Sequence, residues 1–203
     1  MLNDRSCGTD RVTGIRRVAA FLVDCLLIGL YAGALAAVSV YMLGGGSGGW
    51  LDAAFSHPIG AHLLRIATLT GPVLIILAGF EASGRAATPG KRLCGLQVTS
   101  LAGGRLSFRR AVGRNALKLL AWELSHVAVQ QLAAPPTAAD GPTIGTILVL
   151  GLGLTLGALY LAVTLIDPGR GPLYDRLLDT RVTKRRLAPT APYPAAEPAR
   201  PRR

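Results

Sequence analysis

The sequence predicts an all-α membrane protein: a bundle of four transmembrane helices with a short cytoplasmic hairpin or loop and a disordered C-terminal tail. Three observations lead to this fold class. Only 16% of the 203 residues are charged, against roughly 25% in a typical soluble domain. Uncharged residues gather in runs of about 20, the length that a helix needs to cross a hydrocarbon layer of roughly 30 Å. The basic residues flank these runs.

The first predicted span covers about residues 18–43. It follows a basic N-terminal segment, residues 1–17, which we expect in the cytoplasm because basic loops favour that side. A secretory signal peptide is the competing interpretation, since residues 34–36 (Ala-Leu-Ala) resemble a cleavage site. We favour an uncleaved helix, because the apolar run continues past that site and carries a charge, Asp24, inside it.

The second predicted span covers about residues 63–82, and Gly71-Pro72 should kink it near its middle. Proline lacks a backbone donor, and membrane helices tolerate it where a neighbouring group satisfies the freed carbonyl. Arg65 stands at the outer end of this span, where we expect its long side chain to extend towards the membrane surface.

The segment 83–118, which we call the basic block, carries eight Lys and Arg residues. Within it, residues 93–99 and 105–108 have the pattern of two short strands around a glycine turn, which predicts a small hairpin. From Ser107 the pattern becomes helical, with Ser107 as a plausible N-cap. We expect five basic side chains of this block to face anionic lipid head groups or a partner: Lys91, Arg92, Arg109, Arg110 and Arg114.

The third predicted span, about residues 117–134, is ambiguous because it carries Lys118, Glu123 and His126, whereas the fourth, about residues 143–166, has no charge. The charge distribution decides the ambiguity. All but one of the 22 Lys and Arg precede the first span, belong to the basic block or follow the fourth span. These three groups share the cytoplasmic side only if residues 117–134 cross the membrane, fully or as a re-entrant hairpin. We therefore expect a multi-pass protein with both termini in the cytoplasm.

The last residues, 185–203, are rich in Pro, Ala and Arg and predict a disordered tail. The chain thus divides into an N-terminal segment 1–17, a transmembrane domain 18–184 and this tail. The net charge of +11 would suit nucleic acid, but the basic residues flank apolar runs and only 5% of the residues are aromatic. That leaves few rings for stacking on bases, so we expect membrane lipids and no nucleic acid as partners.

The sequence gives no reason to expect an enzyme, a cofactor or a bound metal. No nucleophile stands beside a general base, and the three cysteines have neither zinc-site nor CxxC spacing. Residues 84–91 resemble a phosphate-binding loop, but the segment is one residue too long. Arg92 also stands where a Ser or Thr should hold magnesium.

Asp24 is the most unusual residue of the first span. It lies two helical turns after Arg17, so the two side chains share one face. A carboxylate at that depth is costly unless it is paired or hydrated. Asp24 could therefore serve as a proton or cation site, or could form an ion pair with Arg17 or with a residue of the basic block. We favour the structural interpretation.

Glu123, His126 and Gln130 form one polar stripe on the third span, because their spacing is i, i+3 and i+7. Such a stripe could pass protons, since histidine titrates near neutral pH. It could equally hold neighbouring helices together by hydrogen bonds. The sequence does not choose between these two roles.

Three motifs follow one another in a fixed order along the chain. The first is RVAAFLVD at residues 17–24, and the second is TPGKRLCGLQV at residues 88–98 with Arg114-Asn115 downstream. The third is LYDRLL at residues 173–178, followed by TRV at residues 180–182. This pattern resembles the RDD family of bacterial membrane proteins, named for one Arg and two Asp.

The resemblance implies that Arg17, Asp24 and Asp175 are the three residues that give the family its name. It also implies a location in the bacterial inner membrane. The family usually has a small residue, often Gly, where this chain has Asp179. We expect Asp175 to pair locally or with the basic block, and so to hold the C-terminal segment under the bundle.

Transport is commonly proposed for the RDD family, including cation/proton exchange for some members. The first hypothesis is therefore transport of a small solute or ion, coupled to protons through Asp24, Glu123 and His126. Four helices are few for a lone transporter, so transport would favour a homo-oligomer. The second hypothesis is a membrane scaffold whose basic block and tail bind anionic lipid or another protein.

Overall fold

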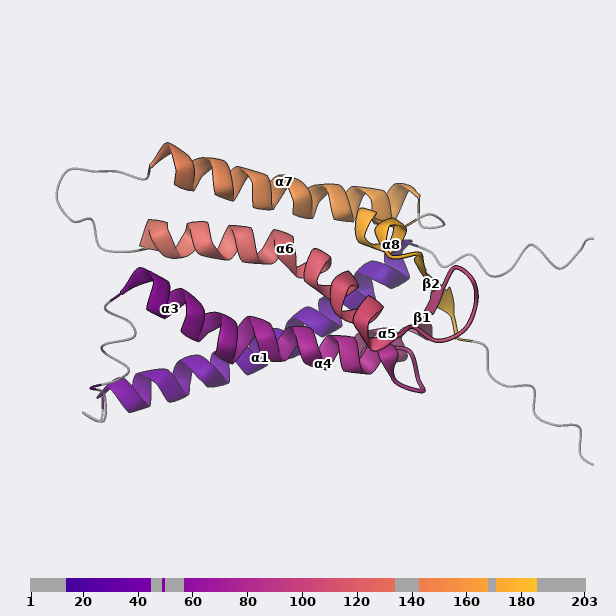
Figure 1. The fold of residues 1–203 in the computed structure, drawn as a ribbon, viewed down its shortest axis with the longest axis horizontal. Coiled ribbons are helices and arrows are strands. Elements are labelled where there is room, and N and C mark those ends of the chain that lie inside the picture. The colour runs from indigo at the N-terminus through magenta and orange to yellow at the C-terminus, as the bar shows by residue number, and fades with distance from the viewer. Residues whose placement is uncertain (1–13, 45–48, 50–56, 134–142, 168–170, 186–203) are drawn as a thin grey trace, which may run out of the picture.

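A computed structural model describes residues 14–44, 49, 57–133, 143–167 and 171–185. All but the first residue of the proposed tail, and most of the N-terminal segment, lie outside these residues. The described chain forms four long helical rods (Figure 1). They are α1 (Gly14–Gly44), the continuous rod α3 (Pro58–Arg65), η1 (Ile66–Thr70) and α4 (Gly71–Ala82), then α6 (Phe108–Ala133) and α7 (Ile144–Ile166).

Four short elements gather at one end of the rods, on the right in Figure 1, which we call the strand end. The strand end receives the start of α1, the end of α4, the start of α6 and the end of α7. Its elements are α5 (Pro89–Leu93), β1 (Leu96–Ser100), α8 (Leu173–Leu177) and β2 (Thr180–Lys184). Every residue of the basic block lies between α4 and the first turns of α6 and therefore belongs to this end.

Three rods are long and apolar enough to cross a membrane: Gly14–Met42, Ile59–Ala82 and Ile144–Ile166. They coincide with the first, second and fourth predicted spans. Their large apolar side chains, such as Leu26, Ile76 and Leu148, are mostly exposed, which is the surface that a lipid environment requires. The described chain is thus a mostly helical membrane protein.

Helix α6 is the third predicted span, but it begins at Phe108, well before residue 117. Ser107 caps it as expected, since its hydroxyl accepts from the Arg110 amide at 3.4 Å. The helix is less apolar than the other rods, yet it packs between α4 and α7. Against α7 it packs closely, because a Cβ added at Gly153 would lie 2.5 Å from the Ser125 hydroxyl. Helix α6 is therefore an inner member of the bundle.

The predicted break at Gly71-Pro72 takes the form of the π-helical turn η1. The Gly71 amide donates to the carbonyl of Ile66 across this wide turn, and a Cβ on Gly71 would lie 2.8 Å from that oxygen. Pro72 has no amide hydrogen to donate to the carbonyl of Thr68. The Tyr31 hydroxyl of α1 donates to that carbonyl instead, at 2.6 Å. A neighbouring helix therefore satisfies the group that proline leaves free.

The predicted hairpin between residues 93–99 and 105–108 is wrong. A strand does form at Leu96–Ser100, but its antiparallel partner is β2, from beyond the last long helix. Leu96, Val98 and Val182 point into a small hydrophobic core with Ala20, Ala78, Leu106 and Ala111. Leu106 enters this core without belonging to a strand, so β1 can pair with β2 and Val182 is buried as well. The main buried core thus lies at the strand end.

Candidate functional site

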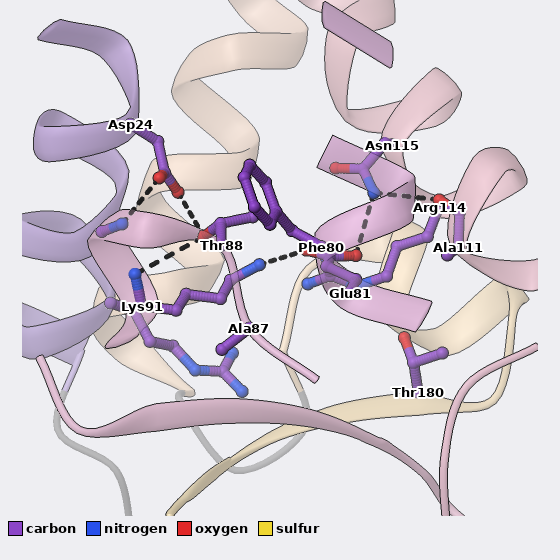
Figure 2. A network of polar contacts seen from close by, with 12 residues as sticks. Asp24, Phe80, Glu81, Ala87, Thr88, Lys91, Ala111, Arg114, Asn115 and Thr180 are labelled. Carbon is purple, nitrogen blue, oxygen red and sulfur yellow. Dashed lines mark hydrogen bonds and ion pairs between the residues drawn. The ribbon is translucent and has the colours of Figure 1, made fainter. Parts of the chain in front are cut away.

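The polar residues of the three sequence motifs meet at the strand end, where they join α1, α4, α5, α6 and α8. Figure 2 shows the part of this network around Asp24, Glu81 and Arg114. Asp24 belongs to the first contact. Its Oδ2 accepts a hydrogen bond from the Thr88 hydroxyl at 2.6 Å, and its Oδ1 accepts from the Gly90 amide at 2.8 Å. Thr88 is also the N-cap of α5. Asp24 therefore anchors the first turn of α5 to α1.

Gly90 is required for this contact. A Cβ at residue 90 would overlap the carbonyl oxygen of Ala20 and would lie 2.9 Å from Oδ1 of Asp24. The backbone of α5 consequently touches the backbone of α1 with no side chain between them. This explains why a proline and a glycine follow Thr88 in the second motif, since proline favours the first helical turn.

Glu81, at the end of α4, is the acceptor at the centre of the network. It is fully buried and accepts from Arg114 Nη1 at 2.7 Å and from Asn115 Nδ2 at 2.9 Å. The Lys91 ammonium also pairs with it. One carboxylate thus binds two cations and one amide from the second motif, as Figure 2 shows.

Arg114 connects this centre to the C-terminal motif. Its Nε donates to Oδ1 of Asp175 at 2.7 Å, and its guanidinium lies 5.2 Å from the ring centroid of Tyr174. Asp175 Oδ1 also accepts from the Thr180 hydroxyl at 3.1 Å. Burial raises the pKa of Tyr174 to about 12, so its phenol is neutral at physiological pH. Asp175 pairs with the basic block as expected.

Arg17 and Asp24 share a face of α1 but do not pair, because no cation lies within 4 Å of Asp24 among the described residues. Arg17 turns to the C-terminal segment instead. It lies 3.7 Å from Oδ2 of Asp175 and donates to the carbonyl of Val182 at 3.3 Å. The ion pair predicted for Asp24 is therefore replaced by neutral donors of the basic block.

The structure corrects two of the five basic residues predicted to face lipid or a partner. Lys91 and Arg114 are buried, because each pairs with Glu81. Arg92 is half-buried, with its guanidinium 4.9 Å from the ring centroid of Phe80. Arg109 and Arg110 are exposed. The sequence could not separate these groups, since all five stand in one basic segment.

The predicted proton path is not assembled as one unit. Glu123 accepts from Arg65 Nη2 at 2.5 Å and from the Thr70 hydroxyl at 2.9 Å. His126 stacks on Trp122, and its Nε2 lies 3.3 Å from Gln130 Nε2. Arg65 is consequently buried against α6, so the prediction that it extends to the surface is wrong.

A cavity of about 610 Å³ lies between α1, α4, α6 and α7. Its wall is mostly apolar and includes Ile28, Val73 and Leu154. At the strand end its floor is polar and contains Arg17, Asp24, Lys91, Arg114, Lys118, Tyr174 and Asp175. Glu123 and His126 do not line it. The cavity therefore reaches the motif residues and leaves the predicted polar stripe outside.

Glu81 and Asn115 are the functional-site candidates that sequence reasoning undervalued. Glu81 stands in the last turn of a predicted span, a position that in sequence is equally typical of an interfacial residue. A charged residue inside an apolar run was the available signal. Within the described chain, no group of three or more His, Cys, Asp or Glu is placed to hold a metal ion.

The model of one protein family, described as "RDD family", matches residues 12–179 of this chain. This match covers most of the chain, including Arg17, Asp24 and Asp175. The chain belongs to the RDD family. No curated protein and no solved structure matches the chain significantly.

The RDD resemblance also explains one strained position. Asp179 occupies the place where the family usually has a small residue, and its φ is +51°. Glycine adopts such left-handed backbone without strain, whereas other residues do so at a cost, aspartate less than most. The carbonyl of Asp179 accepts from the Leu101 amide at 2.8 Å, so this turn sets the start of the β1–β2 pair.

Proposed function

We propose that this RDD protein spans the membrane four times, with both termini in the cytoplasm, and moves a small solute or ion through the cavity between its helices. Three apolar rods are long enough to span. The proposal adds α6 as the fourth span and makes the strand end the cytoplasmic face.

Helix α6 supports a fourth span because two polar residues along it, Glu123 and Asn115, bind partners inside the bundle. Glu123 binds Arg65 and Thr70, and Asn115 binds Glu81. A polar side chain that is paired inside the bundle avoids the free-energy cost of facing lipid. A mean hydropathy does not distinguish such a residue from an unpaired one. The strand end also gathers the whole basic block, as the rule for cytoplasmic charge requires. A reporter fused after residue 138 that read cytoplasmic would overturn this topology.

The cavity is the observation that carries the transport proposal. A transporter needs a space inside the bundle that reaches polar residues, and this one extends from apolar walls to Asp24 and the other residues of the floor. A scaffold needs only a packed bundle and an adhesive surface. Proton coupling through Asp24 gains support from its place in the floor. Glu123 and His126 lie outside the cavity, so the proposed route leaves them out.

The test is flux into vesicles that contain the purified protein. The vesicles hold a pH-sensitive dye, and gradients of sodium, potassium or octanesulfonate are imposed in turn. Ala158 lines the cavity on α7, whereas Ala162 is exposed and does not line it. Ala158→Phe should therefore block flux, and the matched variant Ala162→Phe should retain it.

We expect at least one gradient to move protons in the wild type and in Ala162→Phe but not in Ala158→Phe. Asp24→Asn should lose the proton movement if the carboxylate carries it. Absence of flux from folded, correctly oriented protein would overturn the proposal. The scaffold hypothesis would then be pursued by pull-down with the basic block intact and with two of its exposed residues, Arg109 and Arg110, neutralised.

A further inference from the structure

The charges on the cavity floor are unequally satisfied. Each carboxylate of the network already has close donors: Asp24 binds Thr88 and Gly90, and Glu81 binds Arg114 and Asn115. Asp175 binds Arg114 and Thr180 through Oδ1, whereas its Oδ2 has no hydrogen-bond partner and lies 3.7 Å from Arg17. Asp24 and Glu81 therefore have little remaining need of a partner, and Asp175 is already close to Arg17.

Two cations of the floor are incompletely paired. No carboxylate lies within 4 Å of the Lys118 ammonium in the described part of the chain, and the centroid of the Phe21 ring lies 5.3 Å from it. Arg17 has a buried Nε without a hydrogen-bond partner. Among the described residues, the carboxylate that Arg17 pairs with is Asp175, at a long 3.7 Å. Both side chains line the cavity.

The charges of the whole network also sum to a positive excess. Four cations, Arg17, Lys91, Arg114 and Lys118, face three carboxylates, Asp24, Glu81 and Asp175. An uncompensated cation beside an apolar wall is costly, and the face of one aromatic ring compensates it only partly. A bound anion would complete the set, whereas a metal cation would add to the excess.

The rest of the cavity restricts what that anion can be. Above the floor the wall is formed by side chains such as Ile28, Leu69 and Val73. A small hydrated anion would leave this wall without a partner. The volume of about 610 Å³ lies within the roughly 300–1,000 Å³ that is usual for organic ligands. A molecule with one acidic head and one apolar chain matches both parts.

We propose that the cavity binds a single-chain acidic lipid, with its anionic head group at Lys118 and Arg17 and its chain along the apolar wall. This inference rests on the proposed function, because it names the class of solute that would be moved. A single chain fits one cavity between four helices, and the membrane itself would supply such a molecule to residues at this depth.

The chain contains its own reporter of occupancy. Cys25 lines the cavity one residue after Asp24 and is partly exposed. With Cys7 and Cys94 replaced by serine, Cys25 is the remaining thiol. Its rate of alkylation by N-ethylmaleimide, followed by intact mass, then measures access to the cavity. The protein is held in nanodiscs of phosphatidylcholine, so that no detergent competes for the site.

The probes are lysophosphatidate and lysophosphatidylcholine with the same acyl chain; the first has an anionic phosphate head group, and in the second an added choline makes the head group zwitterionic. We expect lysophosphatidate to slow the alkylation of Cys25 at least fivefold and lysophosphatidylcholine to have little effect. Lys118→Gln should abolish the protection and Lys118→Arg should retain it. Arg109→Gln, on the exposed face of α6, should leave it unchanged. Protection is expressed as a ratio within each variant, because residue 118 itself influences the thiol.

Equal protection by the two lipids, or protection that survives in Lys118→Gln, would overturn the inference. The thermal midpoint of Lys118→Gln is measured alongside, and Lys118→Arg separates a loss of charge from a loss of fold. Vesicle flux without selective protection would leave transport standing and refute the acidic lipid. Selective protection without flux would refute transport and leave a lipid-binding protein.

Discussion

At the scale of single residues, Arg114 is the residue that connects the polar network of the strand end, because it pairs with both Glu81 and Asp175. Arg114 is 2% exposed and bridges the other two, one on α4 and one on α8. A guanidinium suits this position because its fork presents donors in two directions. Asp24 and Arg17 then hold α1 against the same assembly from the other side.

Arg114→Ala should be the most damaging change in the network. It leaves Glu81 and Asp175 buried with fewer partners, and breaking a buried pair costs about 3–5 kcal/mol. For a chain of this size that corresponds to a fall of roughly 10 °C in the thermal midpoint. The measurement is thermal unfolding of the purified protein in detergent.

The matched control for Arg114→Ala is Arg109→Ala, which removes an exposed guanidinium from the same helix. It should shift the midpoint by no more than about 1–2 °C, since exposed charges contribute little. Equal midpoints for the two variants would mean that the pairs of Arg114 do not contribute to stability.

Tyr31→Phe should show how much the hydrogen bond to the Thr68 carbonyl contributes to the free energy of unfolding. The change removes one hydroxyl and leaves a carbonyl unsatisfied beside Pro72, at a cost of about 1 kcal/mol. Tyr41→Phe is the control, because Tyr41 is 77% exposed. Chemical or thermal unfolding of both variants in the same detergent gives the difference, and a neutral Tyr31→Phe would contradict the assignment.

The sequence predicted which residues matter here better than it predicted how they pair. Arg17, Asp24 and Asp175 stand out by motif, and the pairing of Asp175 with the basic block was expected. The partner of Arg17 was not, because it lies beyond the last long helix and depends on how α8 and β2 fold back. Lys91 and Arg109 look alike in sequence, and only the position of Glu81 distinguishes them.

At the scale of elements, close backbone contacts decide where the helices meet. Helix α5 has only five residues, yet it touches α1 directly at Gly90. Helix α7 meets α6 at Gly153 in the same way. In both places a side chain would separate the two helices, so these contacts are possible only because glycine has no Cβ.

Gly90→Ala should separate α5 from α1. The added methyl group overlaps the Ala20 carbonyl and presses on Asp24, and overpacking of this kind typically costs about 1–3 kcal/mol. Gly33→Ala is the matched control on α1, since nothing lies within 4 Å of the added Cβ. It should be neutral or stabilising, because alanine favours a helix over glycine by up to about 1 kcal/mol. The same sign for both variants in thermal unfolding would refute the contact.

Sequence patterns recovered the long helices because their apolar runs are local signals. The patterns failed for the hairpin: the turn glycines are present, but the strand that pairs with β1 is remote in the sequence. The form of the break before Pro72 was also not predictable, since a π-helical turn depends on the carbonyls that Gly71 and Tyr31 reach in space. Helix α6 was ambiguous because its polar residues are matched only in the assembled bundle.

At the scale of the whole molecule, the β1–β2 pair joins the segment after the last long helix to the segment between α4 and α6. The register places Thr99 opposite Arg181 and Val98 opposite Val182. The side chains of Thr99 and Arg181 point away from the buried core, so they can be replaced without disturbing it.

Thr99→Cys with Arg181→Cys, in a background without the native cysteines, should form a disulfide under mild oxidation. Directly paired residues of an antiparallel sheet lie about 5.5 Å apart at Cα, within the range that a disulfide spans. The bridge closes a long loop and should raise stability by up to about 4 kcal/mol. Thr99→Cys with Thr183→Cys is the control, because it is out of register by two residues. Mobility on a non-reducing gel measures disulfide formation in both variants. Faster cross-linking of the control pair would refute the register.

The place of α8 and β2 after the last long helix has a consequence for how the protein is made. A ribosome releases Arg17, Glu81 and Arg114 long before it releases Asp175 and Val182. Until then Arg114 has one of its two carboxylates, and Arg17 has neither of its partners. The nascent chain therefore passes through a stage in which inserted helices carry unsatisfied charge at the strand end. The final residues of the fold therefore complete the bundle, and a chain interrupted before Asp175 would lack the partners of Arg17 and one partner of Arg114.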